Sequence, residues 1–333
     1  MRMSKLKPII TKLVLAGHPA LITGPPGCGK TDMFRQIAEE IEWDFLPIIP
    51  VICDPTDAKG IPVLNKKTGL WEWQPIGDVR RILYATEPML VLIDDFGQAP
   101  AMVQASFMQW LLLRKIGEHP IPDCVSMMAA SNRRGDKCAV TGMIEAVKGR
   151  FASIYEMTPH VDDWSEWAMT HDMPDKLISA VRFLPNLLTD FVPTPDLKRG
   201  PSARNLAWVG KLSNLGIEDL ESLSGAVGEG AAAELLTHFR IWNELPNLTA
   251  LIADPDSAHV PTNLATLYAI STGIAAQASA TNISRIFKYS KRMPQDFDIL
   301  VGRDCIRRDK DMKIQQTKAF TEWILRNKNV LAA

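Results

Sequence analysis

The segment Gly24-Pro-Pro-Gly-Cys-Gly-Lys-Thr31 constrains this chain more than any other feature of its sequence. It follows the short apolar run Ala20–Thr23, which is typical of a β-strand, and it precedes a helical pattern from Thr31 to Trp43. Glycines allow backbone N–H groups to fold around an anion, and the start of a helix adds partial positive charge. Strand, loop and helix together predict a loop that binds phosphate groups.

The residue types within this loop suit a nucleotide. Lys30 supplies a positive charge to the β- and γ-phosphates, and the hydroxyl of Thr31 is a ligand for Mg²⁺. Cys28 stands where a small residue is tolerated. We therefore expect the nucleotide to be bound by Gly24, Pro25, Pro26, Gly27, Cys28, Gly29, Lys30, Thr31 and Asp32.

A pair of carboxylates follows a second apolar run. Met89–Ile93 is continuously apolar, as expected for a strand buried on both faces, and Asp94 and Asp95 come directly after it. In a parallel sheet this places the acids at the same edge as the phosphate loop. We expect Asp94 to hold Mg²⁺ and Asp95 to orient or activate the attacking water.

Three further residues are candidates for the same site. Asn132 follows the predicted buried strand Cys124–Ala130 and would reach the γ-phosphate or the water, although an Asn there also suits a turn. Arg150, at the end of a helical pattern, suits charge on a transferring phosphoryl group or simply complements the helix dipole. Arg204 follows the predicted N-cap Ser202, where a cation opposes the dipole and so indicates an outside partner.

The first 158 residues alternate short apolar runs with helical patterns, which predicts an α/β domain with a parallel sheet. One interruption, Ile61–Val63 and Leu70–Trp73 around a Lys66-Lys67 tip, reads as a β-hairpin insert near 61–73. The remaining segments expected here are strands at 45–53 and 152–157, and helices from Asp78, from Pro100 and at 139–150.

After residue 160 the strand pattern disappears and helical patterns follow, punctuated by prolines. The sequence therefore predicts an all-α second half, divided into a lid at 159–245 and a C-terminal extension at 246–333. The expected helices are 162–170, 175–184, 202–212, 231–245, 263–277, 282–292 and 315–326.

Composition excludes several classes of protein. With 37 Lys+Arg against 38 Asp+Glu, the chain is not a strongly basic nucleic-acid coat. No apolar run approaches the roughly 18 residues of a membrane-spanning helix, and no signal peptide is expected. The five cysteines, Cys28, Cys53, Cys124, Cys138 and Cys305, are scattered and odd in number, which favours reduced thiols in a cytoplasmic protein.

At these motifs the chain resembles the AAA+ ATPases, and within them the MoxR-like group that includes the NirQ/CbbQ/NorQ activators. Gly24–Thr31 is similar to Walker A, Leu90–Asp95 to Walker B, Asn132 to sensor 1, Arg150-Phe151 to the arginine finger and Arg204 to sensor 2. The resemblance implies ATP and Mg²⁺ as ligands and a homo-oligomeric, commonly hexameric ring in which Arg150 acts in the neighbouring site. It also implies chaperone-like activation of a partner protein, often one with a von Willebrand factor A domain.

The chain departs from the family pattern next to the acid pair. Asp95 stands where the family usually has Glu, and its side chain is shorter by one C–C bond of about 1.5 Å. A misplacement of about 1 Å costs on the order of 10²-fold in rate, so we expect slow hydrolysis with binding intact. Gly97 and Gln98 replace the family's usual Asn and basic residue.

Three functions remain open on the sequence. The first is an ATP-driven remodeller whose hairpin grips a polypeptide through Trp71 and Trp73, unless these side chains only pack the hairpin onto its domain. The second is a nucleic-acid-linked ATPase, suggested by the basic segment from Arg285 to Lys313, which also suits a solvated helical face. The third is a switch that binds ATP with little hydrolysis.

Overall fold

The computed structural model describes residues 1–136, 142–190 and 199–331. Cys138 and the beginning of the helix expected at 139–150 lie outside the described residues. The chain divides into two compact units, Met1–Pro159 and His160–Ala333.

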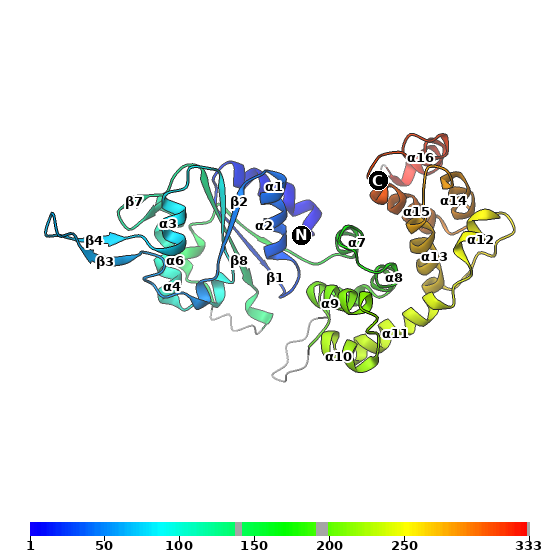
Figure 1. Cartoon of the computed structure of the whole chain (residues 1–333), viewed down its shortest axis with the longest axis horizontal. Helices are drawn as coiled ribbons and strands as arrows, with labels where there is room; N and C mark the ends of the chain where they lie inside the picture. Colours follow the sequence, from blue (N-terminus) through cyan, green and yellow to red (C-terminus); the bar gives the residue numbers. More distant parts are fainter. Residues whose placement is uncertain (137–141, 191–198, 332–333) are drawn as a thin grey trace. The chain divides into compact units, whose positions relative to one another are not determined.

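The first unit is built on a five-stranded parallel sheet in the order β2-β5-β8-β1-β9 (Figure 1). The strands are the apolar runs of the sequence, and those at the centre are buried on both faces, which explains their unbroken hydrophobicity. Their bounds are β1 Ala20–Gly24, β2 Asp44–Ile48, β5 Met89–Ile93, β8 Val125–Asn132 and β9 Ser153–Glu156.

Alternate side chains of the strands enter two cores, one on each face of the sheet. Leu21, Val91 and Met127 belong to one core, whereas Ile22 and Leu92 belong to the other. The second core is covered by α1 and α2, and the first by the remaining helices of the unit (Figure 1). These helices are α1 Met3–Leu15, α2 Lys30–Glu40, α3 Gly77–Leu83, α4 Ala101–Ser106, α5 Met108–Leu113 and α6 Glu145–Lys148.

The predicted hairpin insert is confirmed. Strand β3, Ile61–Leu64, pairs antiparallel with β4, Trp71–Gln74, as a separate two-stranded sheet that extends away from the main sheet (Figure 1). A second, very short hairpin, β6 Lys115–Ile116 with β7 His119–Pro120, has no counterpart among the sequence predictions.

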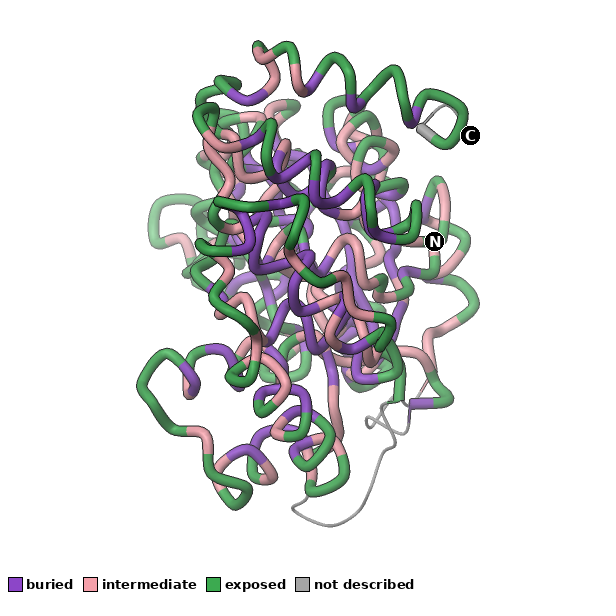
Figure 2. The backbone as a smooth tube through the Cα atoms, turned by 90° about the vertical axis from the view of Figure 1, so that its right-hand side faces the viewer, coloured by how far each residue is buried: buried purple, intermediate pink, exposed green. Residues whose placement is uncertain are grey.

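In its described part, 160–190 and 199–331, the second unit contains helices and no strand, as predicted. Buried and exposed residues alternate along most of these helices (Figure 2), whereas residues 269–275 are continuously buried. The helices are α7 Val161–Thr170, α8 Asp175–Phe183, α9 Ala203–Asn214, α10 Leu220–Val227, α11 Glu229–Asn243, α12 Leu248–Ala253, α13 Leu264–Ala276, α14 Ile283–Ser290, α15 Gln295–Arg308 and α16 Lys318–Leu331.

The second unit has two hydrophobic clusters, one among α7–α11 and one among α12–α16. A buried ion pair joins the two groups of helices: Arg182 of α8 makes bonds of 2.5 and 2.7 Å to Asp304 of α15. The same guanidinium donates to Thr272 of α13 at 3.1 Å. The helices on either side of residue 245 are therefore held together by polar contacts as well as by packing.

The fold class predicted from the sequence, an α/β domain with a parallel sheet followed by helices, is confirmed. Two element predictions are wrong. The strand expected to reach Cys53 ends at Ile48, because Pro50 has a fixed φ and no N–H and begins a short 3-10 helix. Among the described residues of 139–150, only Glu145–Lys148 is helical.

Candidate functional site

The register of the sheet brings the predicted motifs to one edge. Gly24, where the phosphate loop begins, pairs with Asn132 at the end of β8. On the other side of β8, Ile93 pairs with Ala129, and the backbone N–H of Asp94 donates to the carbonyl of Ile48 at 2.8 Å. Parallel strands thus deliver the loop, the acid pair and Asn132 to the same end of the sheet.

Two observations show that the phosphate loop needs its glycines. Gly29, which precedes α2, has φ of +99°, a left-handed conformation that side chains disfavour. A Cβ on Gly24 would lie 2.6 Å from the carbonyl oxygen of Met157. Helix α2 has no capping side chain at its N-terminus, so its first backbone N–H groups suit an anion supplied from outside.

The ammonium group of Lys30 is fixed on the loop and on β8. It donates to the carbonyls of Gly24 and Pro25, each at 3.0 Å, and to Oδ1 of Asn132 at 2.7 Å. The residue is only 6% exposed. A buried cation held among carbonyl and amide oxygens carries its charge at the mouth of the loop, which suits contact with phosphate.

Thr31 and Asp94 supply oxygen ligands side by side. The hydroxyl of Thr31 donates to Oδ2 of Asp94 at 2.6 Å. A hydroxyl and a carboxylate are the hard oxygen donors that Mg²⁺ accepts, together with waters and substrate phosphates. These two residues therefore fit Mg²⁺. No cluster of three or more His, Cys, Asp or Glu side chains able to hold a metal occurs elsewhere in the described part of the chain.

Asp95 is held by its own backbone and by two amides. Its φ of +51° puts it in the left-handed region, which Asp tolerates better than most residues. Its Oδ1 accepts from the side-chain amide of Gln98 at 2.8 Å and from that of Asn132 at 3.4 Å. A continuous chain of contacts thus runs from Gln98 through Asp95 and Asn132 to Lys30.

Gln98 is the site residue whose role the sequence did not reveal. It stood out only as a departure from the family pattern, because nothing in a linear motif says that its amide reaches back three residues to Asp95. Arg133 was also missed. It makes ion pairs with Asp136 at 2.9 Å and Glu156 at 3.0 Å, directly after Asn132. Both arrangements depend on turns that follow the strands.

Arg150 lies at the opposite end of the sheet. It follows α6, two residues before Ala152, whose N–H donates to the carbonyl of Pro19 at 2.8 Å. Pro19 lies just before the start of β1, and the phosphate loop begins at the end of β1. The five residues of this strand separate its two ends by about 13 Å. The guanidinium of Arg150 instead donates to the carbonyl of Ala146.

Two predicted site residues lie apart from this network in different ways. Asp32 lies in the first turn of α2 and accepts hydrogen bonds from Arg35 and Gln36. Arg204 belongs to the second unit, where it is exposed in the first turn of α9. The N-cap predicted for this helix is confirmed, since Ser202 accepts from the N–H of Asn205 at 3.2 Å.

The thiol of Cys28 is a poor nucleophile in this loop. Burial raises the pKa of the Cys28 thiol above its ordinary value, and the nearby charge of Lys30 offsets this only in part. A protonated thiol is the unreactive form. Cys28, Cys53, Cys124 and Cys305 are free cysteines.

A parallel sheet in which β1, an inner strand, runs into a glycine loop, with acids at the end of β5 and an amide at the end of β8, defines a P-loop NTPase fold. No protein-family model and no curated protein matches the sequence. In the described residues, no helix is long and apolar enough to cross a membrane.

Several solved structures match this chain at low sequence identity and with TM-scores below 0.5. The Holliday junction branch migration motor RuvB of Thermotoga maritima is 14% identical, with 82% of this chain and 80% of that chain covered and a TM-score of 0.40. NtrX from Brucella abortus in complex with ADP is 14% identical, with 99% of this chain and 68% of that chain covered and a TM-score of 0.38.

Proposed function

We propose that this protein is a Mg²⁺-dependent ATPase that forms a ring and remodels or activates a partner protein. One observation carries the proposal. The register of β1 against β8 sets the ammonium of Lys30 2.7 Å from Asn132, and Asn132 in turn contacts Asp95. This is the set of charges and amides that hydrolysis of a nucleoside triphosphate requires.

Each residue has a role in this proposal. Lys30 and the N–H groups at the start of α2 bind the β- and γ-phosphates, and Thr31 and Asp94 hold Mg²⁺. The ion, when bound, neutralises charge on the phosphate oxygens. Asp95 orients the attacking water and takes its proton. Since Gln98 and Asn132 engage Oδ1 of Asp95, we assign Oδ2 to the water.

The two arginines act from outside this network. Arg150 belongs to the strand end opposite the loop, so we propose that it acts in the site of a neighbouring subunit. An arginine supplied in this way neutralises charge on the transferring phosphoryl group. Arg204 is proposed to contact the γ-phosphate of its own subunit. Both roles imply a homo-oligomer, and the family resemblance favours a hexameric ring.

Activation of a partner protein is supported by the hairpin as well as by the resemblance to the MoxR-like group. Trp71 is 71% exposed and Trp73 is 36% exposed, which speaks against the alternative in which both tryptophans only pack the hairpin onto its domain. An exposed pair of tryptophans suits contact with another protein. A protein with a von Willebrand factor A domain is the client that the resemblance suggests.

The charge pattern of the second unit gives less support to the nucleic-acid alternative. In the basic segment 285–313, several cations make ion pairs with acids. Lys313 contacts Asp311 at 2.7 Å, and Arg307 contacts Glu166 at 3.1 Å. Lys288 and Arg308 likewise contact Asp256 and Asp175. Paired cations contribute less to phosphate binding than a basic patch does.

The test is the ATP turnover rate per subunit at increasing protein concentration, with Lys30→Ala as the blank. A rate that rises steeply and then saturates is expected, because Arg150 of a neighbour completes the site. A measurable rate that does not depend on concentration would overturn the ring. ATP binding with no turnover above the blank would favour the third function, a switch that binds ATP without hydrolysing it.

A further inference from the structure

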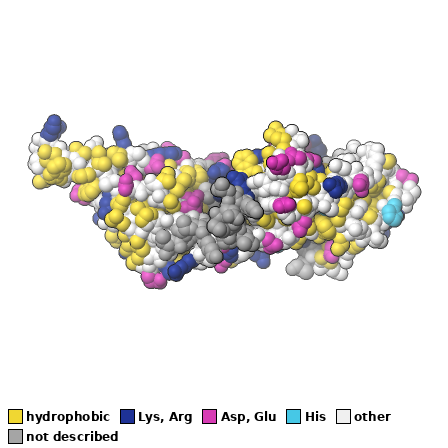
Figure 3. Space-filling model, turned by 90° about the horizontal axis from the view of Figure 1, so that it is seen from below, with side chains coloured by type: hydrophobic (Ala, Val, Ile, Leu, Met, Phe, Trp, Pro, Cys, Tyr) yellow, Lys and Arg dark blue, Asp and Glu magenta, His cyan; other side chains and the backbone are white. Residues whose placement is uncertain are grey.

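The exposed large hydrophobic side chains of the described residues are most densely grouped in residues 49–76, which contain the hairpin. Figure 3 shows hydrophobic side chains gathered over this end of the first unit, with Lys or Arg side chains at the extremity. A soluble protein seldom leaves such a group in contact with water unless another molecule covers it.

The pairing register puts both tryptophans of the hairpin on one face, together with Pro62 and Leu64. Leu64 pairs with Trp71 and Pro62 with Trp73, so these four side chains point to the same side. Leu64 is 45% exposed and Trp71 is 71% exposed. We call these four residues the hairpin face. The opposite side carries Ile61, Val63, Glu72 and Gln74.

Each edge of the hairpin has a backbone group that is missing or already occupied, which disfavours the addition of another strand. The N–H of Asn65 donates to the carbonyl of Leu70 at 2.9 Å, so these two residues form a hydrogen-bonded pair. Hydrogen-bonded and non-hydrogen-bonded pairs alternate along the hairpin, and Pro62 and Trp73 form a non-hydrogen-bonded pair whose backbone groups point outward. Pro62 has no N–H to donate. The carbonyl of Trp73 already contacts His119 at 3.3 Å. The same alternation leaves the outward backbone groups of only one further residue at each edge, Leu64 or Trp71, so we expect a partner to bind chiefly through side chains on the hairpin face.

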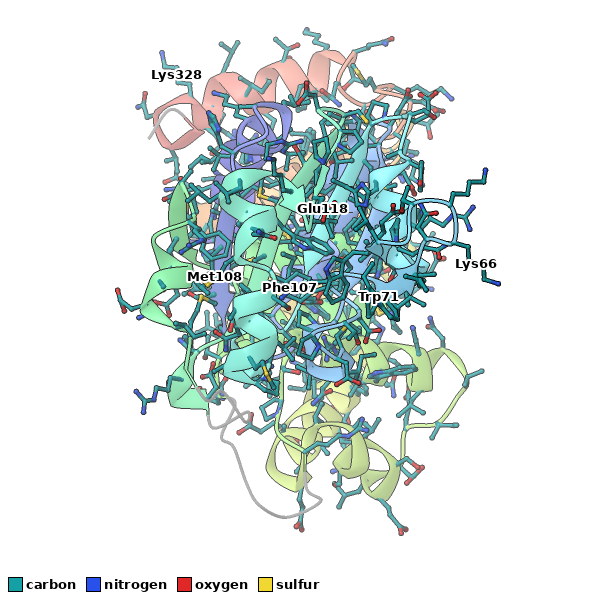
Figure 4. All side chains as sticks on the ribbon, turned by 90° about the vertical axis from the view of Figure 1, so that its left-hand side faces the viewer. Lys66, Trp71, Phe107, Met108, Glu118 and Lys328 are labelled. Atoms are coloured by element: carbon teal, nitrogen blue, oxygen red, sulfur yellow. The ribbon has the colours of Figure 1, made fainter. Side chains whose placement is uncertain are left out.

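The tip of the hairpin is cationic. Lys66 points away from the body of the unit (Figure 4). In the described residues, neither Lys66 nor Lys67 makes an ion pair. The nearby acid, Glu72, is occupied by the side-chain amide of Asn65 at 2.8 Å and lies on the other side of the hairpin. The partner must therefore present negative charge beyond its apolar part.

The position of the charges distinguishes a polypeptide from a membrane. A hairpin that entered a bilayer would place its tip deepest, and here the tip carries two lysines while the apolar residues lie behind it. We propose that the hairpin face binds an exposed apolar segment of a partner polypeptide that carries carboxylates at one end. The proposal deepens the proposed function by giving the chemistry of the client segment.

The test uses fluorescence anisotropy with two labelled peptides. One has the sequence Glu-Asp-Leu-Ile-Phe-Val-Leu-Gly, and the other has two lysines in place of the acids. We expect the acidic peptide to bind wild-type protein and Trp71→Ser to weaken that binding by at least about tenfold. The double variant Lys66→Glu, Lys67→Glu is expected to prefer the lysine peptide.

Two matched controls lie elsewhere on the surface. Val63→Ser changes the opposite side of the same hairpin, and Trp208→Ser removes a tryptophan of the second unit that is 49% exposed. Both should bind the acidic peptide as the wild type does. Equal binding by wild type and Trp71→Ser would overturn the proposal, and so would failure of the wild type to bind.

Two other occupants are separate outcomes that would also overturn the proposal. Sedimentation of the wild type, and not Trp71→Ser, with vesicles rich in phosphatidylserine would assign the hairpin face to a membrane. A smaller oligomeric mass for Trp71→Ser in analytical ultracentrifugation would assign it to a second copy of this chain. ATP turnover is measured on the same variants. If the wild type shows no turnover, the proposed ATPase activity is wrong, but the peptide-binding result remains valid.

Discussion

The ammonium nitrogen of Lys30 lies 2.7 Å from Oδ1 of Asn132, which joins the phosphate loop to β8, the neighbour of the strand that ends in the acid pair. The other amide atom of Asn132 contacts Asp95 at 3.4 Å. One side chain therefore connects the group that we assign to phosphate with the group that we assign to water. Changes at Asn132 should separate binding from chemistry.

Replacement of Asn132 by Ala should lower turnover far more than affinity. Lys30 keeps its two carbonyl contacts in the loop, so ATP binding should change by less than about threefold, whereas turnover should fall by about tenfold to hundredfold. Equilibrium binding of a fluorescent ATP analogue and steady-state phosphate release measure the two quantities. Equal losses in both would show that Asn132 serves the loop alone.

Replacement of Asp95 by Glu should raise turnover, because the longer side chain restores the reach that the family usually has. Asp95→Asn should abolish turnover and leave binding intact, since an amide cannot take a proton from water. The pair of variants is compared by single-turnover hydrolysis. If Asp95→Glu leaves the rate unchanged or lowers it, side-chain length does not limit hydrolysis in this chain.

A mixture of two inactive variants should regain activity if Arg150 acts in a neighbouring site. Arg150→Ala lacks the arginine and Lys30→Ala lacks phosphate binding, but a Lys30→Ala subunit can offer its own Arg150 to an intact loop. Phosphate release is measured as the two proteins are mixed at a constant total concentration. Activity of the mixture no greater than the sum of its parts would place Arg150 outside the catalytic arrangement.

The buried pair of Arg182 and Asp304 should be strongly coupled in stability. Their side chains are 4% and 0% exposed, so Arg182→Met leaves a buried carboxylate without its partner and should cost about 3–5 kcal/mol of unfolding free energy. The double variant Arg182→Met, Asp304→Leu should recover most of this loss. Urea denaturation followed by circular dichroism measures it, with Lys148→Met at an exposed pair as the control.

His238 should make the second unit less stable in acid. Burial lowers the pKa of His238 from 6.5 to about 4. Between pH 6.5 and pH 4, this histidine is therefore protonated in the unfolded chain and neutral in the folded chain. The unfolding free energy should therefore be unaffected above pH 6.5 and should fall by up to about 3 kcal/mol as the pH drops toward 4. His238→Gln should remove this component from a series of thermal denaturations; an identical pH profile would contradict it.

Local motifs explain why part of the site could be predicted. Lys30 and Thr31 lie within eight consecutive residues, and the positions of Asp94 and Asn132 follow from strand ends in a parallel sheet. The contact of Gln98 with Asp95 could not be predicted in this way. It depends on the left-handed backbone at Asp95, which no hydrophobic pattern records.

In the fold, too, some elements could be predicted from local sequence and others could not. Strand β5 is a continuous apolar run and β8 is mostly apolar, and both were found, whereas α15, Gln295–Arg308, was missed. Its sequence is crowded with charges, because Asp298 and Asp304 are buried in ion pairs with Arg326 and Arg182 instead of lying on the outside. A helix that buries its acids shows no clean apolar stripe. Such pairing is a tertiary property and cannot be read from spacing.

Pro62 has a consequence for the protein at high concentration. Two exposed tryptophans on an isolated hairpin would ordinarily invite neighbouring copies to stack edge to edge into fibres. A missing N–H at one edge, and a carbonyl already engaged by His119 at the other, interrupt the hydrogen-bond ladder that such growth requires. An edge of the hairpin therefore offers a growing fibre only a short, broken ladder, which disfavours stacking while the tryptophans stay exposed.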